Sequence, residues 1–249
     1  MKKPAIIWDF DGTLLPNDPY DSEQSLLIFQ MQLAACKFPF HKKIATRAVI
    51  YADRKEWLPG NYFKWPYVRL LKNTPIHALD RVAEKLAEKI PKIDRGTIRE
   101  LSQRGYNMLV ISCGTADLSQ RVLAFAGIDN CFSHILANRF TIKNSRIAGM
   151  RYSILAPEDK LAALQARHVY PETCIAVGDG YTDIPLLDRV KIPILLDRTG
   201  GKRRLAKTKG YHVITAIPEL IQHRVVGTLV PRAPHPKRSV SIHTVRGTF

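Results

Sequence analysis

The stretch Ala5-Ile6-Ile7-Trp8-Asp9-Phe10-Asp11-Gly12-Thr13 decides how this chain folds, because an apolar run ends abruptly in two acids that one residue separates. A continuous apolar run of about four to eight residues is typical of a parallel strand that is buried on both faces. Open α/β sheets bind ligands at the carboxyl ends of such strands. The stretch therefore predicts a short buried strand that presents Asp9 and Asp11 at a ligand-binding edge.

These two acids suit either metal binding or proton transfer. Side chains two residues apart on an extended chain point to the same side, so Asp9 and Asp11 would share one small volume if the strand continued through both. Two carboxylates that close repel, and unless a cation lies beside them one keeps a proton. Mg²⁺ binds one or two carboxylates together with substrate phosphate oxygens, and a protonated carboxyl is a general acid. Gly12 permits a tight turn, and Thr13 places a hydroxyl near a bound anion. The alternative is an acidic turn that merely closes a strand.

The composition is that of a folded globular chain. Its 249 residues, 45% of them apolar, suffice for one large α/β domain or for a core with a smaller companion. No apolar stretch approaches the ~18 residues that span a bilayer, and the first apolar run is too short for a signal peptide. We therefore expect a cytoplasmic protein without a membrane span. The cysteines show neither disulfide nor zinc spacing and are expected to be reduced thiols: Cys36, Cys113, Cys131 and Cys174.

The charge is strongly positive and concentrated towards the end of the sequence. The formal net charge is +16, and residues 199–249 contain ten Lys or Arg against one acid, Glu219. Such a bias attracts nucleic acid, anionic lipid or a phosphorylated substrate, and it says nothing about the fold. The alternative is a solvated basic tail. No aromatic residues alternate with these basic residues as a nucleic-acid stacking surface would require, so nucleic-acid binding is the less favoured partner class.

The region after the first strand reads as helical. Helices are expected from Asp21 or Ser22 through Leu33, over His41–Glu56 and over Ile76–Ile90, with an aromatic-rich segment, 62–67, between the last two. We expect a helical cap subdomain over residues 16–93, above the carboxyl end of the sheet. Residues 1–15 and 94–225 would form the core, and residues 226–249 a basic extended tail.

Helices and strands alternate from residue 94 onwards, which predicts a doubly wound α/β sheet. The expected helices are 94–104, one from 116, 158–167, one from 184, a basic helical stretch after 196, and 218–223. The expected strands are 106–111, 134–137, 173–177, 192–196 and 211–214, with a hairpin over 139–152 that turns at 143–145.

Three further segments at the ends of predicted strands or helices contain residues that could bind phosphate or metal. Ser112-Cys113-Gly114-Thr115 lies between a strand and a helix, where free backbone N–H groups bind phosphate. Lys160 lies in the first turn of a helix, where a cation opposes the helix dipole and needs an anionic partner; the alternative is a surface lysine. Gly178-Asp179-Gly180-Tyr181-Thr182-Asp183 ends a second buried strand in two acids, and its glycines allow backbone and metal to approach closely.

Taken in this order, the four motifs resemble those of the haloacid dehalogenase superfamily of phosphatases, in its phosphoserine phosphatase-like branch. The resemblance covers about residues 4–196 and implies a Rossmann-like core with a helical cap inserted after the first strand. It implies a Mg²⁺-dependent phosphomonoester hydrolase that acts through an aspartyl-phosphate.

The resemblance also implies a role for each motif residue. Asp9 would be the nucleophile and Asp11 the acid that protonates the leaving oxygen and then activates water. Mg²⁺ would be bound by the Asp9 carboxylate, the Asp11 main-chain carbonyl and Asp179, with Asp183 orienting its water ligands. The phosphate oxygens would be held by Thr13, Ser112, the amides of Cys113 and Gly114, and Lys160.

Substrate choice would lie in the cap, where the sequence is less informative. Asp18 stands where similar proteins acting on phosphorylated amines or amino acids place an acid, and Tyr20, Arg47, Arg54 and Arg69 follow it as candidates. The expected substrate is a small phosphorylated metabolite of the phosphoserine, phosphoethanolamine, phosphocholine or sugar phosphate type. A phosphotransferase or mutase shares the first half-reaction and stays open, as does a non-catalytic protein that binds phosphate or nucleic acid through the basic C-terminal segment. The sequence leaves the oligomeric state open.

Overall fold

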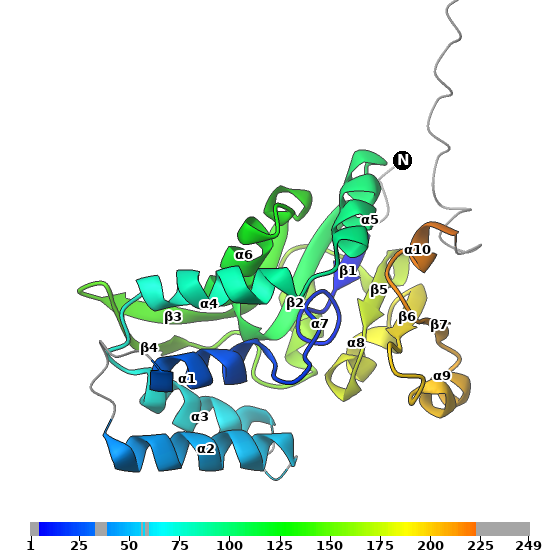
Figure 1. Cartoon of the computed structure of the whole chain (residues 1–249). Helices are drawn as coiled ribbons and strands as arrows, with labels where there is room; N and C mark the ends of the chain where they lie inside the picture. The colour runs from blue at the N-terminus through cyan, green and yellow to red at the C-terminus, as the bar shows by residue number, and fades with distance from the viewer. Residues whose placement is uncertain (1–4, 33–38, 56, 58–59, 223–249) are drawn as a thin grey trace, which may run out of the picture.

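The computed structural model of this chain describes residues 5–32, 39–55, 57 and 60–222 (Figure 1). Cys36 and the predicted tail, 226–249, lie outside the described residues. Among the described helices, none combines the length and the apolarity that crossing a bilayer demands.

A seven-stranded sheet with the order β4-β3-β2-β1-β5-β6-β7 forms the centre of the described structure. Every neighbouring pair is parallel except β3 and β4, which form an antiparallel hairpin. The strands are β1 (Ala5–Trp8), β2 (Asn107–Thr115), β3 (His134–Lys143), β4 (Arg146–Arg151), β5 (Ile175–Gly178), β6 (Ile192–Leu196) and β7 (His212–Ile214). The predicted doubly wound α/β sheet is confirmed.

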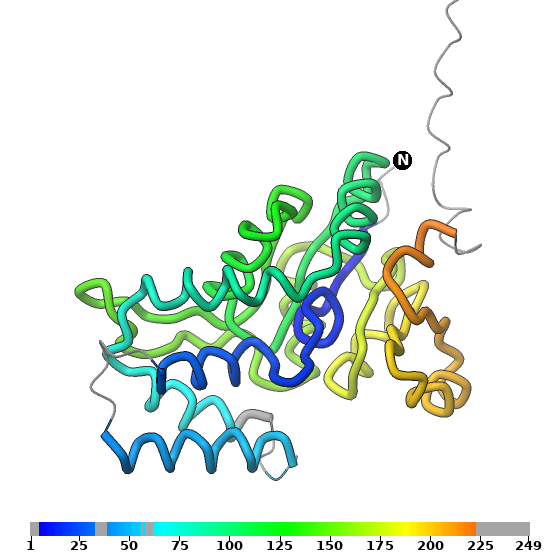
Figure 2. The backbone as a smooth tube through the Cα atoms, viewed as in Figure 1, coloured from blue at the N-terminus to red at the C-terminus, as the bar shows by residue number. Residues whose placement is uncertain are grey.

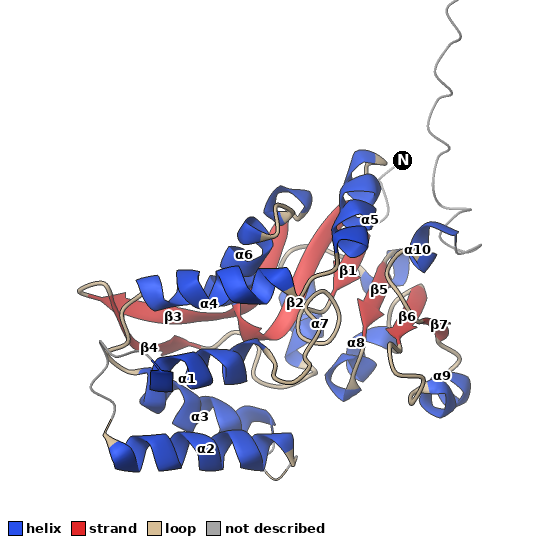
Figure 3. Ribbon diagram, in the orientation of Figure 1, coloured by secondary structure: helices blue, strands red, loops and turns tan. Residues whose placement is uncertain are grey.

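Strand β1 is buried on both faces, as its unbroken apolar sequence predicts. Ile6 and Trp8 pack into one apolar cluster, and Ala5 and Ile7 pack into the other, because successive side chains of a strand point to opposite faces. Helices α4, α5, α6 and α10 contribute to the first cluster, and α7, α8 and α9 to the second. The ribbon shows the helix layers on the two faces (Figure 3).

The described α-helices have the following bounds: α1 (Ser22–Gln32), α2 (Phe40–Arg54), α3 (Gly60–Leu71), α4 (His77–Glu88), α5 (Lys92–Gln103), α6 (Ala116–Phe125), α7 (Asp159–Gln165), α8 (Ile184–Leu187), α9 (Arg203–Lys209) and α10 (Glu219–Gln222). Short 3₁₀ helices cover Asp129–Cys131, Pro171–Thr173 and Tyr181–Asp183.

Helices α1, α2 and α3 lie together below the hairpin of β3 and β4, and α2 is the outermost of the three (Figure 2). Helix α4 instead packs along α6 on the face of the sheet, where Asp80 and Arg121 form an ion pair of 2.7 Å. The segment between α3 and α4 is tied to β4, since Asn73 N–H donates to the carbonyl of Ile147 at 2.8 Å. The helices inserted after β1 are therefore attached to the sheet at several places.

The structure differs from the sequence-based expectations in three local features. Strand β2 continues to Thr115 through the predicted turn 112–115, with an irregular register against β3 in that segment. The aromatic-rich segment 62–67 belongs to helix α3, which contains Pro66. The predicted strand 134–137 and the first arm of the hairpin form one continuous strand, β3.

Candidate active site

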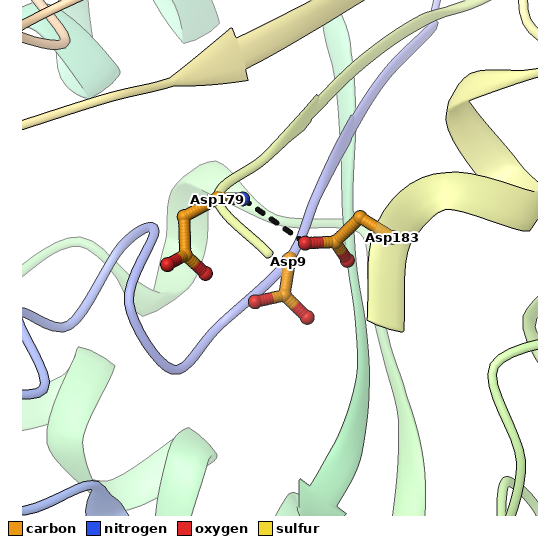
Figure 4. Close-up of side chains that lie close together, drawn as sticks. All are labelled: Asp9, Asp179 and Asp183. Atoms are coloured by element: carbon orange, nitrogen blue, oxygen red, sulfur yellow. Dashed lines mark hydrogen bonds between the residues drawn. The ribbon is translucent and has the colours of Figure 1, made fainter. Parts of the chain in front are cut away.

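Three carboxylates meet at the carboxyl end of the two central strands. Asp9 follows β1, and Asp179 and Asp183 follow β5. One carboxylate oxygen from each lies within 4.8 Å of the others. The three side chains converge on a common space in Figure 4. The sequence reasoning proposed all three as metal ligands or as residues that orient a metal's waters, and the fold brings them together across about 170 positions of sequence.

Backbone hydrogen bonds hold these acids in place. Asp9 N–H donates to the carbonyl of Val177 at 2.9 Å, so the chain after β1 stays in register beside β5. The Asp183 Oδ2 atom accepts the N–H groups of Asp179 and Gly180, each at 3.0 Å (Figure 4 draws the first). A Cβ atom at position 178 would lie 2.4 Å from the Asp183 Cγ atom, so only glycine allows this approach.

Gly12 allows the segment after Asp11 to approach the Asp179 carboxylate closely. Its φ of +86° lies in the left-handed region, and a Cβ atom there would lie 2.3 Å from Asp179 Oδ1. The glycine after Asp11 therefore provides both the turn that the sequence predicts and the room that the Asp179 carboxylate occupies.

Lys160 links the first and last of the three acids. Its side chain is fully buried, and its Nζ atom donates to Asp9 Oδ1 at 2.8 Å and to Asp183 Oδ1 at 2.6 Å. Burial alone lowers the pKa of the lysine, but the carboxylates of Asp183 and Asp9 outweigh burial and raise it, so the ammonium keeps its charge. The anionic partner that the sequence position requires is thus present, which excludes the reading of Lys160 as a surface lysine.

Lys202 is a second cation of the site, and sequence reasoning missed it. Its Nζ atom donates to Asp179 Oδ2 at 2.8 Å and to the Asp179 carbonyl oxygen. Its own N–H donates to Asp197 Oδ2 at 2.8 Å, which anchors the loop after β6. The available signal was topological, because this lysine follows strand 192–196 and the carboxyl ends of neighbouring parallel strands share one edge.

The electrostatics of the cluster favour a bound cation. Burial, followed by the charge of Asp183, raises the pKa of Asp9 well above its ordinary value, and Lys160 opposes this shift. Burial also raises the pKa of Asp179, against the pull of Lys202. Like charges held this close repel, and a bound cation would relieve the repulsion that raises the pKa of Asp9 and Asp179. These hard oxygen donors fit Mg²⁺, which prefers carboxylate and water oxygens.

Asp11 stands apart from this cluster because β1 ends at Trp8, so the condition that the strand should continue through both acids is not met. Its carboxylate accepts the N–H and the Oγ–H of Ser22, both at 2.8 Å, at the start of α1. Burial raises the pKa of Asp11 to about 6, although both Ser22 hydrogen bonds oppose the shift. A carboxyl with this pKa can exchange protons near neutral pH.

The segment predicted to bind phosphate lies beside Asp11. Gly114 N–H donates to Ser112 Oγ at 2.9 Å, and a Cβ atom at position 114 would lie 3.2 Å from Asp11 Oδ2. Burial raises the pKa of the Cys113 thiol to about 11, so the thiol is neutral and only the Cys113 backbone is a candidate ligand. Thr13 has a buried hydroxyl without a hydrogen-bond partner among the described residues.

Asp18 and Tyr20 lie outside the carboxylate cluster. Asp18 is exposed, and its charge raises the pKa of Lys89 against the larger, lowering effect of burial. The Tyr20 carbonyl accepts from Lys89 Nζ at 3.1 Å, and the Tyr20 ring lies 5.2 Å from the guanidinium carbon of Arg54. Both remain predictions for substrate choice.

A buried ion pair joins the helices after β1 to the strand end that carries Ser112. Lys64 on α3 pairs with Glu23 on α1, and the Thr115 hydroxyl donates to Glu23 Oε1 at 2.9 Å. Sequence reasoning missed this cluster because Glu23 has the position of an ordinary acid in a first helical turn.

Proteins of known function are similar in sequence to this chain. A phosphoserine phosphatase from Archaeoglobus fulgidus is 30% identical over 208 residues, which are 78% of this chain but only 58% of that protein. One from Methanocaldococcus jannaschii is 24% identical over 207 residues, covering 78% of this chain and 85% of its own length. The chain thus spans well under two thirds of the first relative.

Solved structures share the fold. A substrate-bound phosphoserine phosphatase complex superposes with a TM-score of 0.65 at 20% identity, covering 89% of this chain and 98% of that one. A phospho-aspartyl intermediate analogue of phosphoserine phosphatase superposes with a TM-score of 0.64 at 20% identity, covering 89% and 99%. The family model for haloacid dehalogenase-like hydrolases matches residues 6–188, which include Lys160 and all three acids of the carboxylate cluster. This chain belongs to the haloacid dehalogenase-like hydrolase family.

Proposed function

We propose that this chain hydrolyses small phosphomonoesters through an aspartyl-phosphate on Asp9, with Mg²⁺ as cofactor. The observation that carries the proposal is the convergence of Asp9, Asp179 and Asp183 around the buried Lys160 at the end of the central strand. A phosphate dianion and an anionic nucleophile repel each other, so concentrated positive charge is what this reaction needs.

Asp9 is suited to the role of nucleophile. One of its oxygens accepts from Lys160, which orients the carboxylate, and the other, which accepts no hydrogen bond from the described residues, would attack phosphorus. Attack forms the bond between this oxygen and phosphorus while the bond from phosphorus to the leaving oxygen breaks. Lys160 neutralises negative charge beside the transferring group.

Asp11 is suited to proton transfer at the leaving oxygen. Its pKa of about 6 allows it to donate a proton in the first step and to take one from water in the second. Water then attacks phosphorus, releases inorganic phosphate and restores the Asp9 carboxylate. Ser22 holds the Asp11 side chain through both of its carboxylate oxygens.

Mg²⁺ would be held by the Asp9 carboxylate, the Asp11 main-chain carbonyl and Asp179, with Asp183 orienting its water ligands. When bound, it would supply positive charge that draws the phosphate and the carboxylates together. The remaining phosphate oxygens would meet Thr13, Ser112 and the backbone amides of the segment after Ser112. The partnerless Thr13 hydroxyl supports this assignment.

The proposed substrate is a small phosphorylated metabolite, and phosphoserine is the first to test because the named relatives are phosphoserine phosphatases. Asp18 and Tyr20 are the proposed specificity residues. We further propose that residues 16–93 act as the cap of a core formed by 1–15 and 94–225, and that the reaction takes place in the cytoplasm.

The test is Mg²⁺-dependent release of inorganic phosphate from p-nitrophenyl phosphate and from a panel of phosphorylated metabolites, with Asp18→Ala run in parallel for specificity. Asp9→Asn should abolish release, whereas Asp188→Asn, at a surface ion pair with Lys209, should leave it unchanged. Transfer of phosphate to an added acceptor in place of release would identify a phosphotransferase. Salt-sensitive DNA binding without any hydrolysis would refute the proposed enzymatic activity.

A further inference from the structure

Helix α2 presents an apolar stripe to solvent. Phe40, Ile44 and Tyr51 are 78%, 53% and 54% exposed, and Ala48 between them is also exposed. Residues four and then three positions apart lie on one face of a helix, so these four side chains form a continuous line. Trp57, 67% exposed, meets Tyr51 edge to face with ring centroids 5.5 Å apart. We call these five residues the α2 outer face.

The opposite side of α2 packs against the rest of the protein. Thr46 and Ile50 are its buried residues, and Val49 packs against the main apolar cluster. The single acid of α2, Asp53, also lies on this inner side, where it accepts from Gln24 Nε2 at 2.6 Å. The outer face is therefore not required for the fold, and α2 is the outermost helix of its layer (Figure 1).

Cations flank the outer face. Lys43, Arg47 and Arg54 lie on one flank of α2, and no described carboxylate forms an ion pair with any of them. All three line a groove of about 460 Å³ between α1 and α2, whose other walls include Ile28 and Met31. The groove thus combines positive charge with apolar walls directly beside an exposed apolar stripe.

Charge complementarity selects the occupant. A second copy of a chain with net charge +16 would be repelled, and residues 223–249 contain five arginines or lysines and no acid, so they would be repelled as well. A nucleic acid would use planar rings over which bases stack, but the stripe mixes aliphatic and aromatic side chains. An apolar stripe with aromatic residues and a Lys/Arg flank is what a helix lying in the headgroup region of an anionic bilayer displays.

We propose that the α2 outer face and its flanking cations dock this protein on the surface of an anionic lipid bilayer, with α2 parallel to the membrane. Phe40, Ile44 and Tyr51 enter the boundary between headgroups and acyl chains. Arg47 and Arg54 bind lipid phosphates in the groove. This docking is independent of the proposed hydrolase activity and requires no spanning helix.

Co-sedimentation of the full chain with vesicles tests the proposal. Vesicles of phosphatidylcholine with 30% phosphatidylglycerol should bind the protein, and pure phosphatidylcholine should not. Arg47→Gln with Arg54→Gln should lower the affinity on the order of 10-fold or more, and Ile44→Ser with Tyr51→Ser should lower it at least as much, since both remove a known source of interfacial binding. None of these residues is buried in the core, so the far-UV circular dichroism of both variants should match the wild type. The variant with Ile44→Ser and Tyr51→Ser should also release phosphate from p-nitrophenyl phosphate like the wild type.

Matched controls separate this face from other sources of binding. Arg203→Gln and Tyr170→Ser remove an exposed cation and an exposed aromatic residue elsewhere, and both should bind vesicles like the wild type. The proposal is overturned if no vesicle binding occurs, or if the α2 variants bind as well as the wild type, which would assign binding to another basic segment. Tighter binding to single-stranded DNA than to vesicles, lost in the same variants, would overturn it in favour of a nucleic-acid partner.

Discussion

Asp11 illustrates how much one carboxyl depends on its surroundings. Asp9 and Asp11 are two positions apart in sequence, but the first faces Lys160 and two acids whereas the second faces the Ser22 N–H and hydroxyl. Burial raises the pKa of both, to about 6 for Asp11. The division into nucleophile and proton donor that we propose thus follows from two different sets of neighbours.

The raised pKa of Asp11 predicts the pH dependence of the first half-reaction. A donor must be protonated, and a group with a pKa of about 6 is roughly one tenth protonated at pH 7, so the rate of leaving-group departure should fall as the pH rises through 6. Asp11→Asn should lower kcat roughly 10²- to 10⁴-fold and remove this limb of the profile. Measurement with an alkyl phosphate, whose leaving group needs a proton, checks both. An unchanged limb in the variant would mean that another group titrates.

Lys202 predicts a measurable effect on cation binding. Lys202→Gln removes a positive charge next to the Asp179 carboxylate, so Mg²⁺ should bind more tightly, on the order of 10-fold, in a calorimetric titration without substrate. Lys202→Arg keeps the charge and should bind Mg²⁺ like the wild type. Lys209→Gln, at the exposed pair with Asp188, is the control for surface charge. Weaker binding in Lys202→Gln would show that the lysine acts mainly by holding Asp179 in position.

At the scale of elements, the contact between the helices after β1 and the sheet contains a buried ion pair. Glu23 on α1 and Lys64 on α3 are both buried, and Thr115 at the end of β2 donates to the same carboxylate. Burial alone lowers the pKa of Lys64, but the charge and hydrogen bond of Glu23, with smaller contributions from Cys113 and Asp21, raise it above its ordinary value, so the ammonium keeps its charge. This pair fixes the two helices beside the strand end that carries Ser112.

Breaking this pair should destabilise the fold. Lys64→Met leaves the Glu23 carboxylate buried without its cation, so the free energy of unfolding in urea should fall by about 3 to 5 kcal/mol. Glu23→Gln combined with Lys64→Met should recover most of the loss, because neither member of the pair then carries a charge. Arg104→Met, at the part-exposed pair with Glu100, should cost about 1 kcal/mol or less. Additive losses in the double variant would contradict this account.

At the scale of the whole molecule, parallel topology places Asp9, Ser112, Asp179 and Lys202 at one edge, since β2, β1, β5 and β6 are neighbours in the sheet. Like charges are concentrated there, and the folded state holds three carboxylates together that the unfolded chain keeps apart. A divalent cation should therefore stabilise the folded protein as a whole.

Mg²⁺ at 100 times its Kd should raise the free energy of unfolding by about 2.7 kcal/mol. For a chain of this size we expect a rise in Tm of about 5 to 10 °C in differential scanning fluorimetry, reversed by EDTA. Asp179→Asn should remove most of the shift, and Asp188→Asn should retain it. An equal shift in both variants would place the binding outside this cluster.

The α/β class, the position of β1 and the four motifs are predictable from the amino-acid sequence, because each depends on a local pattern: an apolar run, a glycine after it, an acid at its end. The fold confirms the doubly wound sheet and brings three of the four predicted acids, Asp9, Asp179 and Asp183, together with Lys160. These features were predictable because a strand that is buried on both faces must consist almost entirely of apolar residues, and such a run is easily found in a sequence.

The partner that each of these side chains contacts depends on how the whole chain folds. That Asp11 faces Ser22, that Lys202 reaches Asp179, that Lys64 pairs with Glu23, and that α2 leaves an apolar stripe uncovered all depend on contacts between segments far apart in sequence. No local pattern contains these pairs, because burial and charge pairing are fixed by which elements pack against each other, and the packing exists only once the whole chain has folded.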